Sequence, residues 1–469
     1  METISTDLCI IGGGSGGLSL AAGAVQMGAR VILIEGGEMG GDCLNYGCVP
    51  SKALLAAGKA AQSLRKGAVG IAGVEPEIDF AAVKAQVATV IAGIAPVDSQ
   101  ERFEGLGVTV LRGYASFINP REVEVAGKVI RARRFVIATG SQPMIPSTPG
   151  LADVPYLTNE TIFAQTERPA HLLILGGGPI ALEMAQAHRR LGCEVTVIAR
   201  SRVMGRDDAE AVAVVAAALR AEGVTLLEGQ EVARFKPVEG GVEAVLADGR
   251  VLTGTHVLVA TGRVPSIARL NLDAAGVAYS GKGVTVGANL RSSNRRIYAV
   301  GDVAGGPQFT HVAGAHAGVV IRQVLLGLPA KAATVVPWVT YTDPELAQIG
   351  ISEAEARKVH PDVTVLRQEF HHNDRALTEG RDEGFLKLMV VKGRPVGVTI
   401  VGAGAGELIG LWALAMSAGL KLSKVTGMIA PYPTRGEISK RAAGAYFSPK
   451  IFDNPLLKKV VRLVQVLLP

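Results

Sequence analysis

Aromatic residues and cysteines are scarce in this sequence, and charges of neither sign dominate it. Aromatics make up 4% of the 469 residues, and the four cysteines are too few for a disulfide-stabilised scaffold of this length. The net charge of +6 comes without a basic run, which argues against a nucleic-acid partner. What is abundant is glycine, with 58 residues, and apolar side chains, at 48%, a composition typical of α/β proteins with many strand-to-helix turns.

Long hydrophobic runs are missing as well. The first apolar strand, Leu8–Ile11, begins almost at the start, with no basic segment before it. The longest uncharged apolar stretch with a helical pattern, Leu408–Leu420, has 13 residues and falls short of the roughly 20 that a membrane span needs. We therefore expect a buried helix there and a cytoplasmic protein without a leader peptide.

One glycine-turn pattern occurs twice. The apolar strand Leu8–Ile11 leads into Gly12–Gly17, and Leu172–Leu175 leads into Gly176–Ala181. An apolar helix follows each turn, and the next strand comes at the same distance in both. This order is the motif of a dinucleotide-binding βαβ unit, so the sequence predicts two such units.

The first turn has every residue that the motif requires. Gly12 permits the tight turn, Gly14 lets a pyrophosphate approach the backbone, and Gly17 lets the helix pack closely on the strand. The free N–H groups of the helix N-terminus favour an anion. Glu35 ends the second strand, where its carboxylate can accept from ribose hydroxyls. The alternative is a glycine-rich turn without a ligand.

The second turn, with Gly176 and Gly178, lacks that carboxylate. Glu35 lies 23 residues after the first glycine of its turn, and the same count from Gly176 ends at Ala199. Arg200 follows directly, and Arg206 lies a little further along. Arginines attract a 2′-phosphate and can bind it bidentately, whereas a carboxylate would repel it. The pattern favours NADPH over NADH, with a solvated basic loop as the alternative.

The remaining strands suggest how the units are joined. Two apolar strands end alike, in Ala138-Thr139-Gly140 and Ala260-Thr261-Gly262, and each closes a nucleotide-binding unit. Ile297–Asp302 has the pattern of another strand-to-turn nucleotide contact, so the second domain is inserted into the first. We predict an α/β fold of two Rossmann-like domains and a C-terminal α+β domain. The expected boundaries are 1–145 with 266–336, then 146–265, then 337–469.

Two cysteines lie close together in the segment Gly40–Lys52. On a regular helix the Cα atoms of Cys43 and Cys48 would be about 8–9 Å apart, beyond the ~7 Å limit of a disulfide. If they bond, the segment must be distorted. Metal ligands are usually spaced more tightly and accompanied by further cysteines or histidines, which are not nearby. Two unpaired cysteines remain the alternative.

This segment, Cys-x₄-Cys between Gly-Gly and Val-Pro-Ser-Lys, resembles the redox centre of the class I pyridine nucleotide-disulfide oxidoreductases. The similarity runs from Gly12 to Glu437. It implies FAD on the first turn and the nicotinamide on the second. It implies a redox-active Cys43–Cys48 disulfide, in which Cys48 faces the flavin and Cys43 exchanges with substrate. It further implies a homodimer whose acceptor is a small molecule or a metal ion.

The resemblance also gives roles to residues outside the cysteine segment. Lys52 and Glu183 match an ion pair near the flavin, and Asp302 matches a residue that contacts FAD. The remaining cofactor-binding residues that the motifs imply are Gly12, Gly14, Gly17, Glu35, Gly41, Thr139, Gly140, Gly176, Gly178, Arg200, Arg206 and Gly262.

One departure from the family leaves the electron acceptor open. Where the family carries His-Pro-Thr-x-x-Glu, with an acid–base histidine from the partner subunit, this chain has Tyr432 and, in register, Glu437. The tyrosine resembles mercuric reductase, but no C-terminal cysteine pair is present, since no cysteine follows Cys193. We expect catalytic roles for Tyr432 and Glu437, with either a disulfide or a soft metal ion as acceptor.

Two other functions compete with an NADPH-dependent reductase. Dihydrolipoamide dehydrogenase is disfavoured by Arg200, Arg206 and Tyr432. A membrane-associated flavin redox sensor is suggested by the amphipathic basic tail, Pro455–Pro469, which we expect to dock on the protein in preference to a membrane. His371–Asp374 could be a metal site, but a solvated strand end fits better, and no metal is expected.

Overall fold

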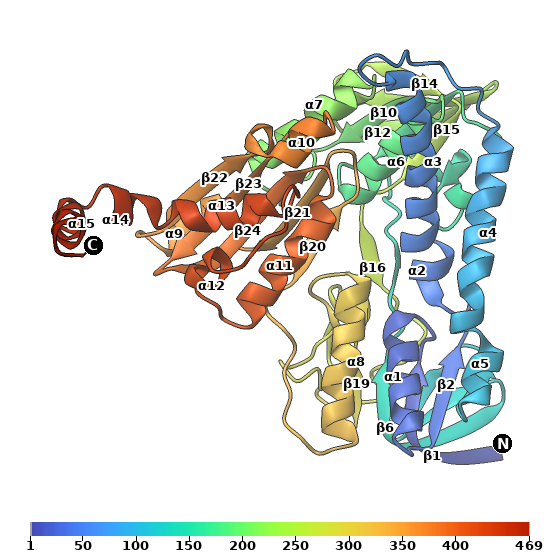
Figure 1. Cartoon of the computed structure of the whole chain (residues 1–469). Coiled ribbons are helices and arrows are strands. Elements are labelled where there is room, and N and C mark those ends of the chain that lie inside the picture. Colours follow the sequence, from blue (N-terminus) through green and yellow to red (C-terminus); the bar gives the residue numbers. More distant parts are fainter. Residues whose placement is uncertain (1, 469) are drawn as a thin grey trace. The chain divides into compact units, whose positions relative to one another are not determined.

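The first glycine turn lies within a seven-stranded sheet of the computed structural model, which describes residues 2–468. The strands follow the order β3-β2-β1-β6-β5-β4, and β19 pairs with β6 (Figure 1). Their bounds are β1 Glu2–Ile11, β2 Val31–Glu35, β3 Thr109–Arg112, β4 Ser116–Asn119, β5 Glu122–Val125, β6 Lys128–Ile137 and β19 Ile297–Ala299. The chain therefore leaves this sheet after β6 and returns to it with β19.

The continuous apolar run in β1 has a structural reason. Leu8 and Ile10 face the core beneath α1 (Ser15–Gln26) and α8 (Thr310–Val324), while Cys9 and Ile11 face the core on the other side of the sheet. Both faces are buried along Leu8–Ile11, so every residue of this part of the strand is apolar. Cys9 is fully buried and packs there as a small apolar residue.

The second glycine turn lies in a five-stranded parallel sheet of order β11-β10-β9-β15-β8. The strands are β8 Tyr156–Leu157, β9 His171–Leu175, β10 Glu194–Ala199, β11 Thr225–Glu228 and β15 His256–Val259, and α6 (Pro179–Arg190) follows the turn. Cys193, just before β10, is fully buried. This parallel sheet and the parallel part of the seven-stranded sheet, in which only β4 and β5 pair antiparallel, confirm the predicted α/β class.

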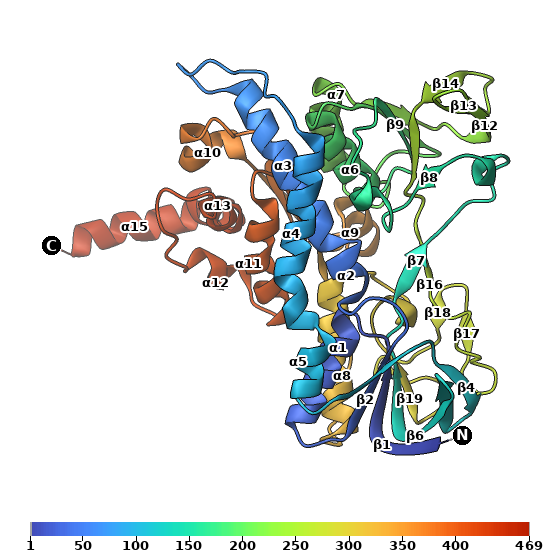
Figure 2. The ribbon, with the colours of Figure 1, turned by 90° about the vertical axis from the view of Figure 1, so that its right-hand side faces the viewer.

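The chain divides into two compact units. The first contains the chain up to Ser201 and Val224–Thr334, and the second contains Arg202–Gly223 and the chain from Val335 on. Both parallel sheets belong to the first unit (Figure 2). The segment Arg202–Gly223, which includes α7 (Ala209–Ala221), belongs to the second unit, although the sequence pattern assigns it to 146–265.

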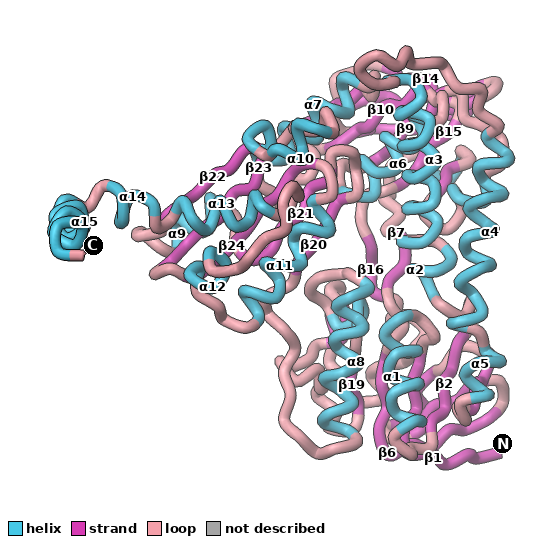
Figure 3. Tube along the Cα trace, in the orientation of Figure 1, coloured by secondary structure: helices cyan, strands magenta, loops and turns pink. Residues whose placement is uncertain are grey.

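The second unit is built on an antiparallel sheet of order β20-β21-β24-β23-β22 (Figure 3). Its strands are β20 Pro337–Thr340, β21 Glu345–Gly350, β22 Thr364–Glu369, β23 Phe385–Val391 and β24 Arg394–Gly402. Two helices pack on this sheet, α11 (Ala405–Ser417) and α13 (Glu437–Ala445). Trp412 of α11 is fully buried and donates to Ser439 Oγ at 3.1 Å. The α+β architecture is as predicted, with β20 and β21 as additional strands.

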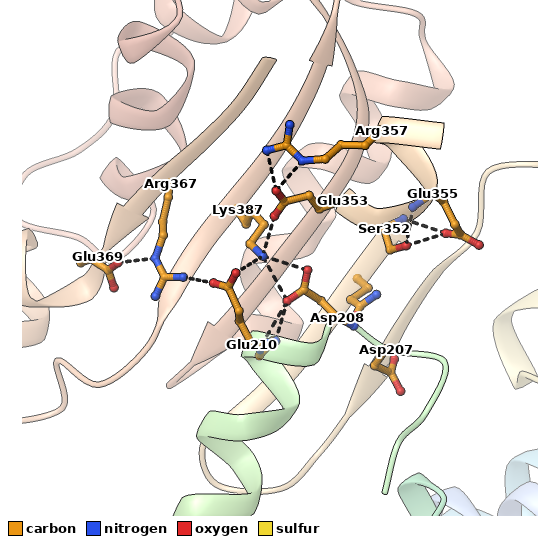
Figure 4. Close-up of polar contacts among 12 residues, drawn as sticks. Asp207, Asp208, Glu210, Ser352, Glu353, Glu355, Arg357, Arg367, Glu369 and Lys387 are labelled. Atoms are coloured by element: carbon orange, nitrogen blue, oxygen red, sulfur yellow. Dashed lines mark hydrogen bonds and ion pairs between the residues drawn. The ribbon is translucent and has the colours of Figure 1, made fainter. Parts of the chain in front are cut away.

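A nearly buried lysine explains why α7 belongs with this sheet (Figure 4). Lys387 Nζ of β23 lies 3.0 Å from Asp208, the N-cap of α7, and 3.3 Å from Glu210 in its first turn. A third carboxylate, Glu353, lies 2.9 Å away. An ammonium group in an apolar sheet requires such partners, because its charge would otherwise be unpaired. The segment before α7 is therefore tied to the C-terminal sheet by charge.

Two helical segments of the chain are rich in apolar side chains. Phe80–Gly105, comprising α4 (Phe80–Asp98) and α5 (Gln100–Gly105), is long and apolar enough to cross a membrane by length and composition. Its charged Lys84 is buried with Phe80, so we interpret α4 as a packed helix of the first unit. The buried Trp412 confirms α11 as a core helix, and the uncharged stretch Ala85–Val97 of α4 has the same length as Leu408–Leu420.

Candidate active site

The first glycine turn is shaped for a phosphate. Gly12 has φ +116°, and a Cβ there would lie 2.3 Å from Ala138 O. A Cβ on Gly17 would lie 1.9 Å from Gly12 O, so the helix can approach the strand only with glycine at this position. At Gly14, in contrast, an added Cβ meets nothing closer than Gly41 Cα at 3.8 Å. The space beside Gly14 is therefore open, as a bound pyrophosphate requires.

The groups around this turn suit a dinucleotide. No side chain caps the N-terminus of α1, whose N–H groups are left to bind an anion. Glu35 ends β2, and its carboxylate accepts from the backbone N–H groups of Gly13 and Gly37. These bonds fix the carboxylate beside the turn and leave lone pairs for ribose hydroxyls.

The second turn repeats this geometry. Gly176 has φ +128°, and a Cβ there would lie 2.2 Å from Ala260 O. Nothing lies within 4 Å of a Cβ on Gly178, and no side chain caps α6. Gly262, after β15, has φ +136°, a conformation that favours glycine. The two turns are equivalent sites for a phosphate-bearing ligand.

The arginines that follow β10 are exposed. Arg200 makes only a loose ion pair with Glu231, at 3.9 Å, and both side chains are mostly in solvent. Arg206 is also exposed, whereas the adjacent Asp207 is buried and accepts from Trp338 Nε1 at 2.7 Å. Arg200 belongs to the first unit and Arg206 to the second, so their joint action on one ligand stays a prediction.

The helix is broken between the two cysteines, as a bonded pair at this spacing requires. Cys43 lies in α2 (Gly41–Asn45), and Cys48 is the first residue of α3 (Cys48–Lys66). Gly47 lies between the two helices, outside helical geometry. A Cβ on Gly47 would lie 2.8 Å from an Asp42 side-chain oxygen, so the break depends on glycine. In this structure the two cysteines are in the reduced form.

The reduced pair is electrostatically asymmetric. A hydrogen bond from Cys43 lowers the pKa of Cys48 to about 6, with help from Thr310 and Lys52. The same hydrogen bond, together with burial, raises the pKa of Cys43. Cys48 also begins α3, where the helix dipole favours an anion. Cys48 is therefore the thiolate, and Cys43 is the thiol that donates to it.

Thr310 is a contact that the sequence analysis missed. Its hydroxyl lies 3.4 Å from Cys48 Sγ and can donate to the thiolate. It begins α8, 262 residues further along the chain, and no local pattern marks it. His316 on the same helix accepts from Gly301 N through Nδ1 at 3.2 Å, which confirms that it is bonded to the backbone.

The structure brings Lys52 and Glu183 together. Lys52 Nζ, one turn after Cys48, lies 2.8 Å from Glu183 Oε2 of α6, and the Glu183 carboxylate is almost completely buried. Because α3 begins at Cys48 and α6 follows the second glycine turn, this ion pair connects the cysteine helix to the helix of that turn. Such a pair holds both helices in one register near Cys48.

A second polar cluster surrounds Asp302, at the end of β19. Ser141 donates to Asp302 Oδ2 at 2.5 Å, and Arg263 Nε donates to Ser141 Oγ at 2.7 Å. Burial raises the pKa of Asp302, opposed by the Ser141 hydrogen bond. Arg263 also lies 2.9 Å from Asp42, immediately before Cys43. The sequence analysis did not predict this cluster of Arg263, Ser141 and Asp42. The position of Asp42, an acid directly before Cys43, was a signal that could have pointed to it.

Two threonines occupy matching positions, each two residues after the last residue of a parallel strand, Thr139 after β6 and Thr261 after β15. Thr139 donates to Ser266 O at 2.8 Å, and Thr261 donates to Met144 O at 2.7 Å. Gly140, after Thr139, has φ +66°. The matched bonds fix the chain where it crosses from one parallel sheet to the other.

Tyr432 and Glu437 do not contact each other as a pair. The Tyr432 hydroxyl donates to Asp374 Oδ2 at 3.0 Å, and this bond raises the pKa of Tyr432. Glu437 Oε2 is buried and has no hydrogen-bond partner among residues 2–468. His371 and His372 are exposed and belong to a 3₁₀ turn, Phe370–His372, and not to the end of a strand. In the described chain, no group of three His, Cys, Asp or Glu residues could hold a metal ion.

These features together define a nucleotide-dependent dithiol enzyme, and comparison with known proteins identifies its class. Residues 6–317 match the family described as pyridine nucleotide-disulphide oxidoreductase, and residues 336–443 match the dimerisation domain of the same family. The chain belongs to this family and is a flavin-dependent oxidoreductase. Its members depend on FAD and a nicotinamide dinucleotide, and the two open, uncapped glycine turns fit such groups.

Several relatives resemble the chain over nearly its whole length. It is 36% identical to mercuric reductase of Acidithiobacillus ferrooxidans, covering 94% of this chain and 82% of the relative. It is also 36% identical to dihydrolipoyl dehydrogenase of Thermus scotoductus, covering 94% and 97%. Among solved structures, the HOCl-induced flavoprotein disulfide reductase RclA of Escherichia coli has a TM-score of 0.85 at 27% identity, covering 93% and 99%. LpdA of Mycobacterium tuberculosis has a TM-score of 0.86 at 26% identity, covering 94% and 99%.

Proposed function

We propose that this protein is a homodimeric, NADPH-dependent reductase that uses Cys43 and Cys48 to reduce an acceptor needing no proton-accepting base. The observation that carries the proposal is the asymmetric setting of the two cysteines: Cys48 begins α3, with the Thr310 hydroxyl 3.4 Å from its sulfur, and this setting favours Cys48 as the thiolate and Cys43 as the thiol. A bound flavin would supply the two-electron relay between the nicotinamide and this pair. The N-terminus of α1 with Glu35 would hold FAD, and the N-terminus of α6 with Arg200 and Arg206 would hold NADPH.

Two acceptor classes fit the reduced pair. A soft metal ion binds thiolates directly and displaces their protons. In a disulfide acceptor, Cys43 sulfur attacks one sulfur as its proton passes to Cys48, and the first acceptor thiolate leaves. The proton then leaves Cys48 for solvent water, and the Cys48 thiolate restored in this way attacks Cys43 sulfur. The Cys43–Cys48 bond forms, and the second acceptor thiolate departs.

Tyr432 is the reason to favour these acceptors. The resemblance to the family places Tyr432 where a partner-subunit histidine would take the proton from the exchange thiol. A base works best when its pKa is near the working pH, and the Asp374 hydrogen bond raises the pKa of a group that already titrates near 10. Tyr432 therefore stays protonated and can only donate a hydrogen bond. A soft metal ion, or a disulfide whose leaving thiol has a low pKa, reacts without such a base.

Known relatives support both acceptor classes. Those similar to this chain include enzymes named mercuric reductase and dihydrolipoyl dehydrogenase. RclA, the flavoprotein disulfide reductase, has been solved as a Cu(II) complex. We favour a soft metal ion or an activated disulfide over lipoamide, because lipoamide is an alkyl disulfide whose exchange requires a base.

The deciding experiment is a panel of acceptors with NADPH as donor. Mercuric and cupric ions, an aromatic disulfide, oxidised glutathione and lipoamide are compared with wild type, Cys43→Ser and Cys48→Ser. We expect rapid reduction of a soft metal ion or the aromatic disulfide, and loss of this reduction in both variants. Rapid turnover of oxidised glutathione or lipoamide by the wild type would contradict the proposal. Cys193→Ala, at a buried cysteine, serves as the control.

A further inference from the structure

The C-terminal helix α15 (Pro455–Leu467) has no buried residue, although it is rich in large apolar side chains. Leu456 is 70% exposed, Leu463 58% and Leu467 69%. The preceding α14 (Ser448–Phe452) adds exposed Ile451 and Phe452. In Figures 1 and 2 α15 projects away from the sheet of the second unit. The sequence analysis favoured docking of this helix on the protein, but no residue of α15 is buried by the described part of the same chain.

The helix is strongly two-sided. Leu456, Val460, Leu463 and Leu467 are spaced by four, three and four residues, which places them on one face. Leu457 and Val464 widen this face to about half of the helix circumference. Asn454 caps the first turn by accepting from the backbone N–H groups of Leu456 and Leu457, so the helix has a defined start. The apolar face thus belongs to a well-formed helix.

The opposite face carries charge of one sign. Its polar residues are Lys458, Lys459, Arg462 and Gln465, and no acidic residue lies between Asn454 and Leu468. Lys458 and Arg462 are four residues apart, so they repel each other along the helix. Nothing within α15 neutralises them. A surface that covers this helix must therefore be apolar on one side of it and negatively charged on the other.

A second copy of the chain meets this requirement poorly. A helix of 13 residues is about 20 Å long, and half of its surface amounts to about 300 Å². A stable interface needs roughly 800 Å² from each partner, so α15 could not hold two copies together by itself, and the segment that matches the dimerisation domain ends at residue 443, before this helix begins. Two copies of α15 would also bring together only cations. An anionic bilayer, in contrast, offers acyl chains to the apolar face and phosphate groups to the lysines and arginine.

We infer that α15 is a membrane-surface anchor, which lies in the plane of an anionic lipid bilayer and holds this enzyme at the membrane. The apolar face enters the acyl boundary, and Lys458, Lys459 and Arg462 reach the lipid headgroups. The helix is too short to span the bilayer. The anchor is separate from the proposed reductase site, so either idea can fail without the other.

The test uses the full-length holoenzyme and vesicles. Sedimentation is measured with vesicles of phosphatidylcholine alone and of phosphatidylcholine mixed with phosphatidylglycerol, at low and high salt. We expect binding to the mixed vesicles that weakens with salt. Each removed cation should lower the affinity about fivefold, so Lys458→Gln, Lys459→Gln and Arg462→Gln together should lower it on the order of a hundredfold. Leu463→Asp should abolish it, and Gln465→Ala, on the polar face, is the matched control.

Truncation after Asn454 distinguishes the possible occupants of the helix. We expect the truncated enzyme to lose vesicle binding while it keeps its dimeric state and its NADPH-linked activity in solution. Vesicle binding that survives truncation would overturn the inference. So would equal binding to vesicles of phosphatidylcholine alone, or no binding by the full-length enzyme. If truncation instead dissociates the dimer, a second copy covers α15 and the membrane assignment is wrong.

Discussion

Tyr432 donates its hydroxyl proton to Asp374 at 3.0 Å, while the buried Oε2 of Glu437, five residues later, has no partner among residues 2–468. In the family motif the residue at the tyrosine position and this glutamate are placed to act together. Here the tyrosine is held by a different acid, on α10 (Asp374–Thr378). A hydroxyl that donates to a carboxylate is a poor proton acceptor and is poorly oriented to act as an acid or a base on another group.

Replacing Tyr432 should change the choice of acceptor. Tyr432→His introduces a group with a pKa near ~6.5 and should raise the rate with oxidised glutathione or lipoamide, by up to about 10²-fold. Tyr432→Phe should slow reduction of the preferred acceptor. Steady-state rates with each acceptor give the measurement, and Asp374→Asn controls for loss of the hydrogen bond alone. An unchanged preferred reaction in Tyr432→Phe would mean that the tyrosine only packs at an interface.

The cysteine pair should show its asymmetry in the spectrum and in its pH dependence. Two-electron reduction of the yellow enzyme should produce a long-wavelength absorbance band from the Cys48 thiolate beside oxidised flavin. Cys48→Ser should abolish the band, and Cys43→Ser should show it at rest. Because the pKa of Cys48 is lowered to about 6, the thiolate and the band should persist at pH 7 and be lost as the pH falls through about 6.

A further variant tests what lowers that pKa. The hydrogen bond from Cys43 is the largest contribution, so Cys43→Ala should move the pKa of Cys48 back toward its ordinary value of 9.0. The pH dependence of alkylation by iodoacetamide reports this shift. Thr310→Val, which removes a weaker contact, should produce a smaller change in the same direction. A Cys43→Ala variant that still titrates near pH 6 would assign the shift to α3 and Lys52.

Preference for NADPH should depend on Arg200 and Arg206. Each charge-assisted contact to the 2′-phosphate is worth about 1.5–3 kcal/mol, so each alanine variant should lose about 10- to 150-fold of the preference. Use of NADH should change little. Values of kcat/KM for both nucleotides measure the ratio. Arg121→Ala, at an exposed arginine beside β5, is the charge-matched control. Full preference retained in both variants would place the 2′-phosphate elsewhere.

Lys387 should be important for the stability of the second unit. Lys387→Met would leave Asp208, Glu210 and Glu353 without their shared cation and should cost about 3–5 kcal/mol. Arg357→Met, which breaks an exposed pair with Glu353, should cost less than about 1 kcal/mol. Unfolding in urea, followed by the fluorescence of Trp338 and Trp412, compares the two. Equal losses would show that the buried charge is already neutralised by solvent.

The pH dependence of this contribution follows from the lysine. Burial lowers the pKa of Lys387, but hydrogen bonds to Glu353 and Asp208 outweigh it and raise the pKa above 10.5. A raised folded-state pKa means that the stabilisation is complete below pH 10.5 and is lost as the pH rises through the folded value. The difference between wild type and Lys387→Met should therefore be constant near neutrality and shrink only in strong alkali.

A homodimer in which Tyr432 faces the Cys43 of the other chain predicts complementation. Cys43→Ser and Tyr432→Phe homodimers should each be impaired with the preferred acceptor. Co-expression should restore up to about a quarter of wild-type activity, since half of the dimers are mixed and each has one intact site. Gel filtration gives the oligomeric state. A monomer with full activity, or mixed dimers with no recovery, would contradict a shared site.

The glycine turns and the α+β character of the C-terminal domain could be predicted because their signals are local. Gly17 is required by its close approach to Gly12, five residues earlier, and the continuous apolar run Leu8–Ile11 follows from burial of both faces of its sheet. The Cys43–Cys48 spacing predicted a distorted segment if the two residues bond, and the structure has a break between α2 and α3, at Tyr46 and Gly47. Residues that act within about 30 positions of one another leave a readable pattern.

Partners distant in the chain were decided only by tertiary structure. Thr310 lies 262 positions from Cys48, and Lys387 lies 179 from Asp208, so no periodicity or spacing relates them. Tyr432 was recognised from its motif, but only the packing of α10 gives it Asp374 in place of Glu437. The tail was recognisable as an amphipathic basic helix, yet its lack of cover depends on what the rest of the chain places beside it. A sequence specifies which groups can pair, and long-range packing, whose cost is chain entropy, selects the pairs that form.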